Sequence, residues 1–164
     1  MTVDVYGERD ELAETKYVAS VLRDIGYRPV THLFTGGIGA YLHFIGEPSH
    51  RVQIALSPGW IADYPSPDAY FDFLFSCQPA TQGNNNSHYC RPDVDELVAE
   101  AKSTQLTDPP AALDLWKRID RRIVDDAPIV PTVNGVINVF TSARVGNVQL
   151  SPMIIFLIDQ MWVK

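Results

Sequence analysis

The chain has 164 residues, of which 46% are hydrophobic, so it has the size and composition of one globular domain with a buried core. Its formal net charge of -7 disfavours a nucleic-acid partner, because binding a phosphate backbone requires clustered lysine and arginine. No apolar stretch is long enough to span a bilayer and no signal peptide is visible. Residues 1–6 already have the pattern of a strand, so we expect the chain to begin inside a larger protein.

The first part of the chain alternates strand and helix patterns. A glycine ends the first helical pattern, and a glycine-rich stretch opens the second. A β-α-β unit of this length normally closes as a parallel crossover, so the pattern predicts a mainly parallel sheet flanked by helices. The expected strands cover residues 3–6, 28–34 and 52–56, the last of them buried, and the expected helices cover 10–25 and 36–45.

Helical patterns dominate the second part, and apolar stripes on them indicate a core rather than a cofactor site. The expected helices cover 68–75, 92–102 and 109–127, extended chain covers 129–133, and strands cover 136–140 and 154–158. The stripe expected on the longest helix consists of Leu113, Trp116, Ile119, Ile123 and Val124.

The stretch from Pro58 to Asp68 follows the third expected strand and combines proline punctuation, a large ring and a carboxylate. Ligands of open α/β sheets usually bind beyond the carboxyl ends of the strands. Asp63 can therefore anchor a cationic group, with Trp60 as a flat apolar wall. Alternatively, Asp63 is a turn residue that binds its own backbone. The residues alone leave both interpretations open.

Cys77 and Cys90 are the two cysteines, 13 positions apart at the ends of a polar loop. This is not the Cys-x-x-Cys spacing of a metal site. It predicts a disulfide worth about 3 kcal/mol, and with it an oxidising compartment; the alternative is a pair of reduced thiols.

Groups for catalysis or metal binding are not apparent. The histidines at 32, 43, 50 and 88 have no metal-site spacing, and no Gly-x-Ser-x-Gly elbow occurs. Ser57 has no identifiable base, and the carboxylate pairs lie at helix ends, where capping explains them. We expect neither an enzyme nor a cofactor or metal ion.

One motif carries a family resemblance. Gly59-Trp60-x-Ala62-Asp63-Tyr64-x-x-Pro67-Asp68 resembles the central motif of the family 5 extracytoplasmic solute-binding proteins of peptide, dipeptide and nickel ABC importers. The segments around Cys77 and Cys90 are similar to the dipeptide-binding branch, which has a disulfide there. The segment 125–131 is similar to the stretch of chain that leads back to the hinge in these proteins.

The resemblance implies a three-layer α/β lobe of a type II periplasmic-binding-protein fold. Residues 1–135 would form most of this lobe, and residues 136–164 a tail that crosses to a second lobe. Asp63 would bind the α-ammonium group of the ligand. Gly59, Trp60 and Ile61 would line the cleft, partly through their backbone.

The implied function is capture of a peptide or small solute without catalysis, for delivery to an ABC-transporter permease. The implied location is extracytoplasmic, with membrane contact only through the transporter or through a lipid anchor absent from this chain. A ligand sensor fused to a transcriptional regulator and a hydrolase are the alternatives. We also expect the apolar tail segment 153–162 to pack on this domain or to pair with another copy.

Overall fold

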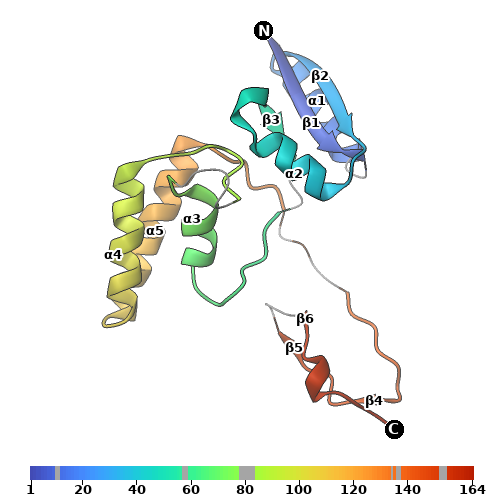
Figure 1. Ribbon diagram of the computed structural model, residues 1–164, viewed down its shortest axis with the longest axis vertical. Helices are drawn as coiled ribbons and strands as arrows, with labels where there is room; N and C mark the ends of the chain where they lie inside the picture. The colour runs from blue at the N-terminus through green and yellow to red at the C-terminus, as the bar shows by residue number, and fades with distance from the viewer. Residues whose placement is uncertain (10–11, 57–58, 78–83, 134, 136–137, 152–154) are drawn as a thin grey trace.

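The computed structural model describes residues 1–9, 12–56, 59–77, 84–133, 135, 138–151 and 155–164. Its amino-terminal part is a parallel three-stranded sheet with the strand order β2-β1-β3 (Figure 1). The elements are β1 (Thr2–Glu8), α1 (Leu12–Asp24), β2 (Arg28–Phe34), α2 (Ile38–Gly46), a short 3-10 helix (Pro48–His50) and β3 (Ile54–Ala55). The predicted parallel sheet flanked by helices is confirmed.

The two helices cover opposite faces of the central strand. A Cβ atom at Gly7 would collide with the Thr15 hydroxyl of α1, so α1 lies close against the side of β1 to which Gly7 belongs. The ring of Tyr6, the preceding residue, packs on Phe44 of α2 at 5.6 Å. Because successive strand residues point to opposite faces, these contacts define helix, sheet and helix layers. Val5 at the centre of β1 is fully buried.

The third strand is shorter and less buried than predicted. The expected strand covered 52–56, whereas β3 comprises Ile54 and Ala55, and both residues are half-buried. Among the described strands β3 pairs only with β1, so it forms an edge of the sheet. An edge strand has a neighbouring strand on one side, which leaves more of it exposed. Tyr41 of α2 reinforces this junction, because its hydroxyl hydrogen-bonds the carbonyl oxygens of Tyr6 and Leu56 at 3.1 and 2.6 Å.

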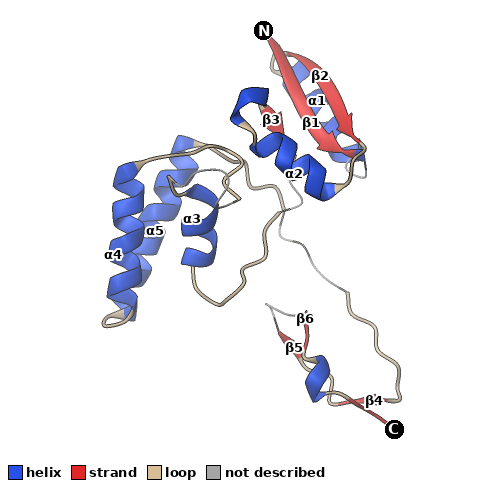
Figure 2. Cartoon of the chain, viewed as in Figure 1, coloured by secondary structure: helices blue, strands red, loops and turns tan. Residues whose placement is uncertain are grey.

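The second part is a cluster of three helices, α3 (Asp68–Phe75), α4 (Pro92–Gln105) and α5 (Pro109–Asp126) (Figure 2). Asp108 caps α5, since its carboxylate accepts a hydrogen bond from the Ala111 N–H at 3.1 Å. The buried core of this cluster consists of Phe75, Val94, Val98, Ala101, Ala112, Leu115, Trp116, Ile119 and Ile123.

The apolar stripe predicted for α5 is partly wrong. Trp116, Ile119 and Ile123 are buried, but Leu113 and Val124 are each 52% exposed. The buried stripe instead begins at Ala112 and includes Leu115. Each helix residue turns about 100° from the one before it, so a residue one position off the stripe lies on the flank of the helix.

The carboxy-terminal segment forms two antiparallel strand pairs. These are β4 (Val145–Gly146) with β7 (Trp162–Val163), and β5 (Leu150–Ser151) with β6 (Ile155–Phe156). A 3-10 helix (Ile158–Gln160) lies between β6 and β7 in the chain. Of the strand predicted over 154–158, residues 155–156 form β6, residues 157–158 are not a strand, and residue 154 lies outside the described part. Of the one predicted over 136–140, residues 138–140 are not a strand and residues 136–137 lie outside the described part.

Figure 1 shows the tail strands apart from the sheet and from the three-helix cluster. The Trp162 ring packs closely against Gly146 inside the tail, so part of its apolar surface is covered locally. For residues 155–162, the described part of segment 153–162, this arrangement gives no support to packing on the rest of the chain. Its pairing with another copy stays a prediction. None of the described helices has the length and hydropathy of a membrane span.

Candidate ligand-binding site

Trp60 fixes the loop after β3 onto α3. Its indole Nε1 donates a hydrogen bond to the Ala69 carbonyl oxygen at 2.9 Å, and its ring stacks on Phe73 with centroids 4.6 Å apart. The side chain is half-buried. The structure therefore shows the indole as a structural anchor of the loop, and its role as a wall beside a ligand stays a prediction.

Asp63 is exposed and lies between the buried Ala62, which is 3% exposed, and Tyr64. Its carboxylate makes no hydrogen bond or ion pair with any residue in the described ranges; residues 57–58 lie outside them. A turn-capping aspartate would accept a hydrogen bond from a nearby backbone N–H. The turn interpretation therefore has no support from the described contacts, and the carboxylate is accessible to a cation.

The other two predicted site residues share this exposed loop. Gly59 has φ of 91°, a backbone conformation that side chains rarely adopt. Ile61 is mostly exposed. Gly59, Ile61 and Asp63 are thus accessible together on a segment whose half-buried member, Trp60, fastens it to α3.

Tyr64 and Asp68 form a second fastening on the other side of Asp63. The Tyr64 hydroxyl donates a hydrogen bond to Oδ2 of Asp68 at 2.7 Å. This hydrogen bond is the main cause that raises the pKa of Tyr64 to about 12. Burial raises the pKa of Asp68, but hydrogen bonds from Ser66 and Tyr64 outweigh it, so that the pKa lies below its ordinary value. At neutral pH the pair is a phenol donating to a carboxylate.

An apolar groove of about 670 Å³ lies beside the same loop, and sequence reasoning missed it. Its lining comes from the loop, α3, α5 and the extended chain after α5, and includes Ala62, Tyr64, Tyr70, Phe71 and Ile129. Asp63 is not part of this lining, although its neighbours Ala62 and Tyr64 are. The groove depends on contacts between segments far apart in the chain, which no local pattern indicates.

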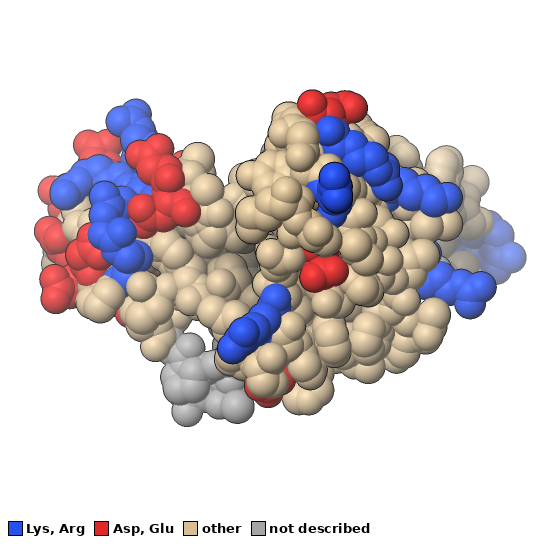
Figure 3. Space-filling view, turned by 90° about the horizontal axis from the view of Figure 1, so that it is seen from above, with Lys and Arg blue, Asp and Glu red and all other residues tan. Residues whose placement is uncertain are grey.

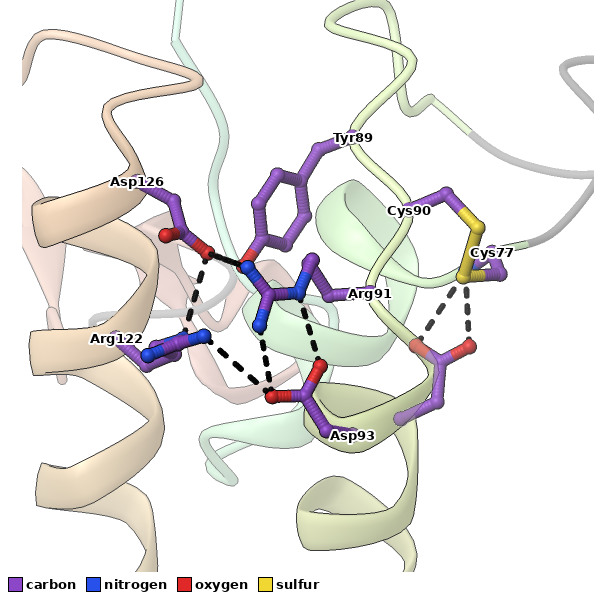
Figure 4. Close-up of polar contacts among 8 residues, drawn as sticks. Cys77, Tyr89, Cys90, Arg91, Asp93, Arg122 and Asp126 are labelled. Carbon is purple, nitrogen blue, oxygen red and sulfur yellow. Dashed lines mark hydrogen bonds and ion pairs between the residues drawn. A yellow bond between two sulfur atoms is a disulfide. The ribbon is translucent and has the colours of Figure 1, made fainter.

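The disulfide predicted between Cys77 and Cys90 is present, and Figure 4 shows it beside the start of α4. The Cys77 N–H donates to the Asp95 carboxylate of α4 at 3.1 and 3.3 Å. The buried Asn85 side chain links the two ends of the segment between the cysteines, since its amide donates to the carbonyl oxygens of Ser76 and Tyr89 at 2.9 and 2.7 Å.

Serine in place of both Cys77 and Cys90 should lower the free energy of unfolding by about 3 kcal/mol, because the unfolded chain gains the freedom of an open loop. Urea unfolding of the oxidised wild type and the variant measures this difference. The single variant Cys77→Ser should cost about as much as the double variant, since either change opens the bridge. Equal stability of the wild type and both variants would contradict the prediction.

An ion network joins the end of this loop to α4 and α5 (Figure 4). Arg91 contacts Asp93 at 2.9 Å and Asp126 at 3.3 Å, and Arg122 lies 3.5 Å from Asp126. The Tyr89 hydroxyl donates to Asp126 at 2.7 Å; burial and this hydrogen bond raise the pKa of Tyr89 to about 12. Asp93 and Asp126 thus make ion pairs, whereas the sequence pattern predicted capping for the carboxylates at these helix ends.

Charged side chains gather at the left of Figure 3, on the side where Figure 1 shows α4 and α5, and both signs are mixed there. Such mixing produces ion pairs rather than a basic stripe of the kind that binds nucleic acid. Two of the histidines have hydrogen-bond partners within the protein, since His32 Nε2 lies 2.9 Å from Asp4 Oδ1 and His50 Nδ1 lies 2.8 Å from the Phe44 carbonyl oxygen. In the ranges given above, no group of three or more side chains could hold a metal ion.

Comparison with known proteins adds the decisive observation. A dipeptide-binding protein of Escherichia coli (strain K12) is 31% identical over 90 residues, which are 55% of this chain and 16% of that protein. Di/tripeptide-binding protein 1 of Pseudomonas aeruginosa (strain UCBPP-PA14) is 31% identical over 98 residues, or 60% of this chain and 18% of that protein. The homologues of this chain are peptide-binding proteins. No family model matches the chain.

Solved structures agree with this result. The periplasmic binding protein DppA from Helicobacter pylori, in complex with the peptide STSA, aligns with a TM-score of 0.66 and 25% identity over 77% of this chain and 24% of that one. The substrate-binding domain of an oligopeptide ABC transporter from Bacillus anthracis aligns at 0.65 and 16% identity, which shows a shared fold. The resemblance to peptide-binding proteins of ABC transporters and their lobe fold is confirmed. The chain spans 16% and 18% of the two curated relatives named above.

Proposed function

We propose that this chain is part of the substrate-binding component of an ABC importer for peptides or similar solutes, and that it binds without catalysis. The observation that carries the proposal is the exposed Asp63 carboxylate, without a partner among the described residues, on a loop that Trp60 fastens to α3. The homologues support it, because their names describe peptide binding and one was solved with a bound peptide.

In the proposed mechanism Asp63 pairs with the α-ammonium group of the peptide, and the backbone of residues 59–61 lines the cleft beside it. A carboxylate and an ammonium form a charge-assisted hydrogen bond that is strong where water is excluded. Closure of a second lobe would exclude that water. Residues 1–135 would supply one side of the cleft, and residues 136–164 would lead to the other lobe.

We also propose a permease partner and an extracytoplasmic location. Homologues of the chain are periplasmic, and the bond between Cys77 and Cys90 suits an oxidising compartment. Neither the comparisons nor the described residues favour a sensor fused to a regulator or a hydrolase.

Titration calorimetry of the full-length protein tests the proposal. The dipeptide Ala-Ala should bind, whereas the same peptide with an acetylated amino terminus should bind far more weakly, because it lacks the ammonium group. Intact peptide recovered after incubation would agree with binding without catalysis. Absence of heat for Ala-Ala and for a panel of longer peptides would overturn the peptide-binding assignment.

A further inference from the structure

Asp63 lies between two fastened points. Before it, Trp60 is bound to the Ala69 carbonyl oxygen; after it, the Tyr64 hydroxyl is bound to Asp68. Both partners belong to the first turn of α3. The backbone that leads from Tyr64 to Asp68 is restrained as well, since the Ser66 N–H donates to the Tyr64 carbonyl oxygen at 2.8 Å. A short loop held at both ends on one helix has few alternative conformations, which lowers the entropy cost of binding through it.

Three carboxylates, those of Asp63, Asp68 and Asp72, act electrostatically on the Tyr64 phenol. Two of them are engaged. Asp68 accepts the hydrogen bond from Tyr64, and Asp72 is paired with Lys102 of α4. Asp63 is the member of this group that has no partner in the described part of the chain.

We infer that Tyr64 and Asp68 are positioning residues of the ligand site, which fix the loop and keep Asp68 engaged so that Asp63 is the carboxylate that meets the ammonium group. This inference rests on the proposed function. Neither side chain needs to touch the ligand. Their hydrogen bond restrains the loop and thereby limits the orientations that the Asp63 carboxylate can adopt. A ligand without a cationic amino terminus gains nothing from it.

The test compares Tyr64→Phe, Asp68→Asn and the double variant of the full-length protein in titrations with Ala-Ala. Each single variant should lower the affinity about threefold to tenfold, the range expected for one hydrogen bond. The double variant should lose no more than the stronger single variant, because both changes remove the same contact. Tyr17→Phe is the matched control: it removes the hydroxyl of an exposed tyrosine on α1, outside the proposed site, and its affinity should equal that of the wild type.

A second cycle separates positioning from general weakening of the fold. In an Asp63→Asn background, Tyr64→Phe should leave the remaining affinity for Ala-Ala unchanged, since no carboxylate is left to position. The ultraviolet titration of the Tyr64 phenol, obtained by subtracting the Tyr64→Phe spectrum, should shift to lower pH in Asp68→Asn.

Wild-type affinity of Tyr64→Phe for Ala-Ala would overturn the positioning role while the peptide-binding function stands. An equal loss in the Asp63→Asn background would assign the effect to the fold and would overturn the role as well. A wild-type protein that binds no peptide would reject the proposed function itself and the positioning role with it.

Discussion

Asparagine at position 63 should weaken binding of Ala-Ala to the full-length protein by about 2–5 kcal/mol. The change Asp63→Asn keeps the size of the side chain and removes its charge, so the peptide ammonium is left in the closed cleft without its anionic partner. Much of the loss is the cost of keeping that ammonium group away from water. Calorimetry of both proteins at neutral pH and moderate salt gives the two dissociation constants.

The matched control is Asp114→Asn, which removes an aspartate on α5 whose side chain is 75% exposed and paired with Lys117. This change should leave peptide affinity unaltered, because it alters net charge by the same amount outside the proposed site. If both variants bind like the wild type, Asp63 is not the ammonium anchor. If both weaken binding equally, the effect comes from net charge.

Truncation of Ile119 to alanine should lower the free energy of unfolding by about 2–5 kcal/mol. Ile119 is 0% exposed and lies in the core cluster that α5 forms with α3 and α4. The substitution removes buried methyl groups and leaves a cavity that the surrounding helices fill only in part. Urea unfolding followed by circular dichroism measures the difference.

Leu113→Ala on the same helix is the control, since leucine and isoleucine have the same volume and Leu113 is half exposed. Its cost should be clearly below that of Ile119→Ala. Equal costs would mean that the core of α5 includes Leu113, as the sequence pattern suggested, and would contradict the packing seen here.

Much of the fold could be predicted because its signals are local. The strand and helix periodicities of residues 1–46 lie within single elements, and Gly26, with φ of 93°, ends the first helix pattern as expected. The pairing of Cys77 with Cys90 was also accessible, since two cysteines allow one bridge. The loop residues 59–63 stood out by composition and by family resemblance, and the structure brings Gly59, Ile61 and Asp63 to the surface together.

The buried face of α5 and the lengths of several strands could not be predicted, because they depend on contacts with segments distant in the sequence. The burial of α5 begins at Ala112 rather than Leu113 because contact with α4 selects one face from a broad apolar stripe. The strand β3 is short because its pairing with β1 extends over two residues, an extent that depends on the partner strand. The apolar tail was assigned long strands, but strand length depends on a partner along the whole segment, and β6 pairs over two residues with β5.

The sequence by itself determined the α/β alternation, the disulfide and the position of the candidate carboxylate, because these follow from periodicity and residue chemistry along a continuous stretch. Only the tertiary structure decided what surrounds that carboxylate. It places the first turn of α3 under the loop, so that Trp60 binds Ala69 and Tyr64 binds Asp68, while Asp63 is exposed and has no partner among the described residues. Hydrogen bonds of this kind require two segments to meet in space, and their geometry exists only after the helix has packed.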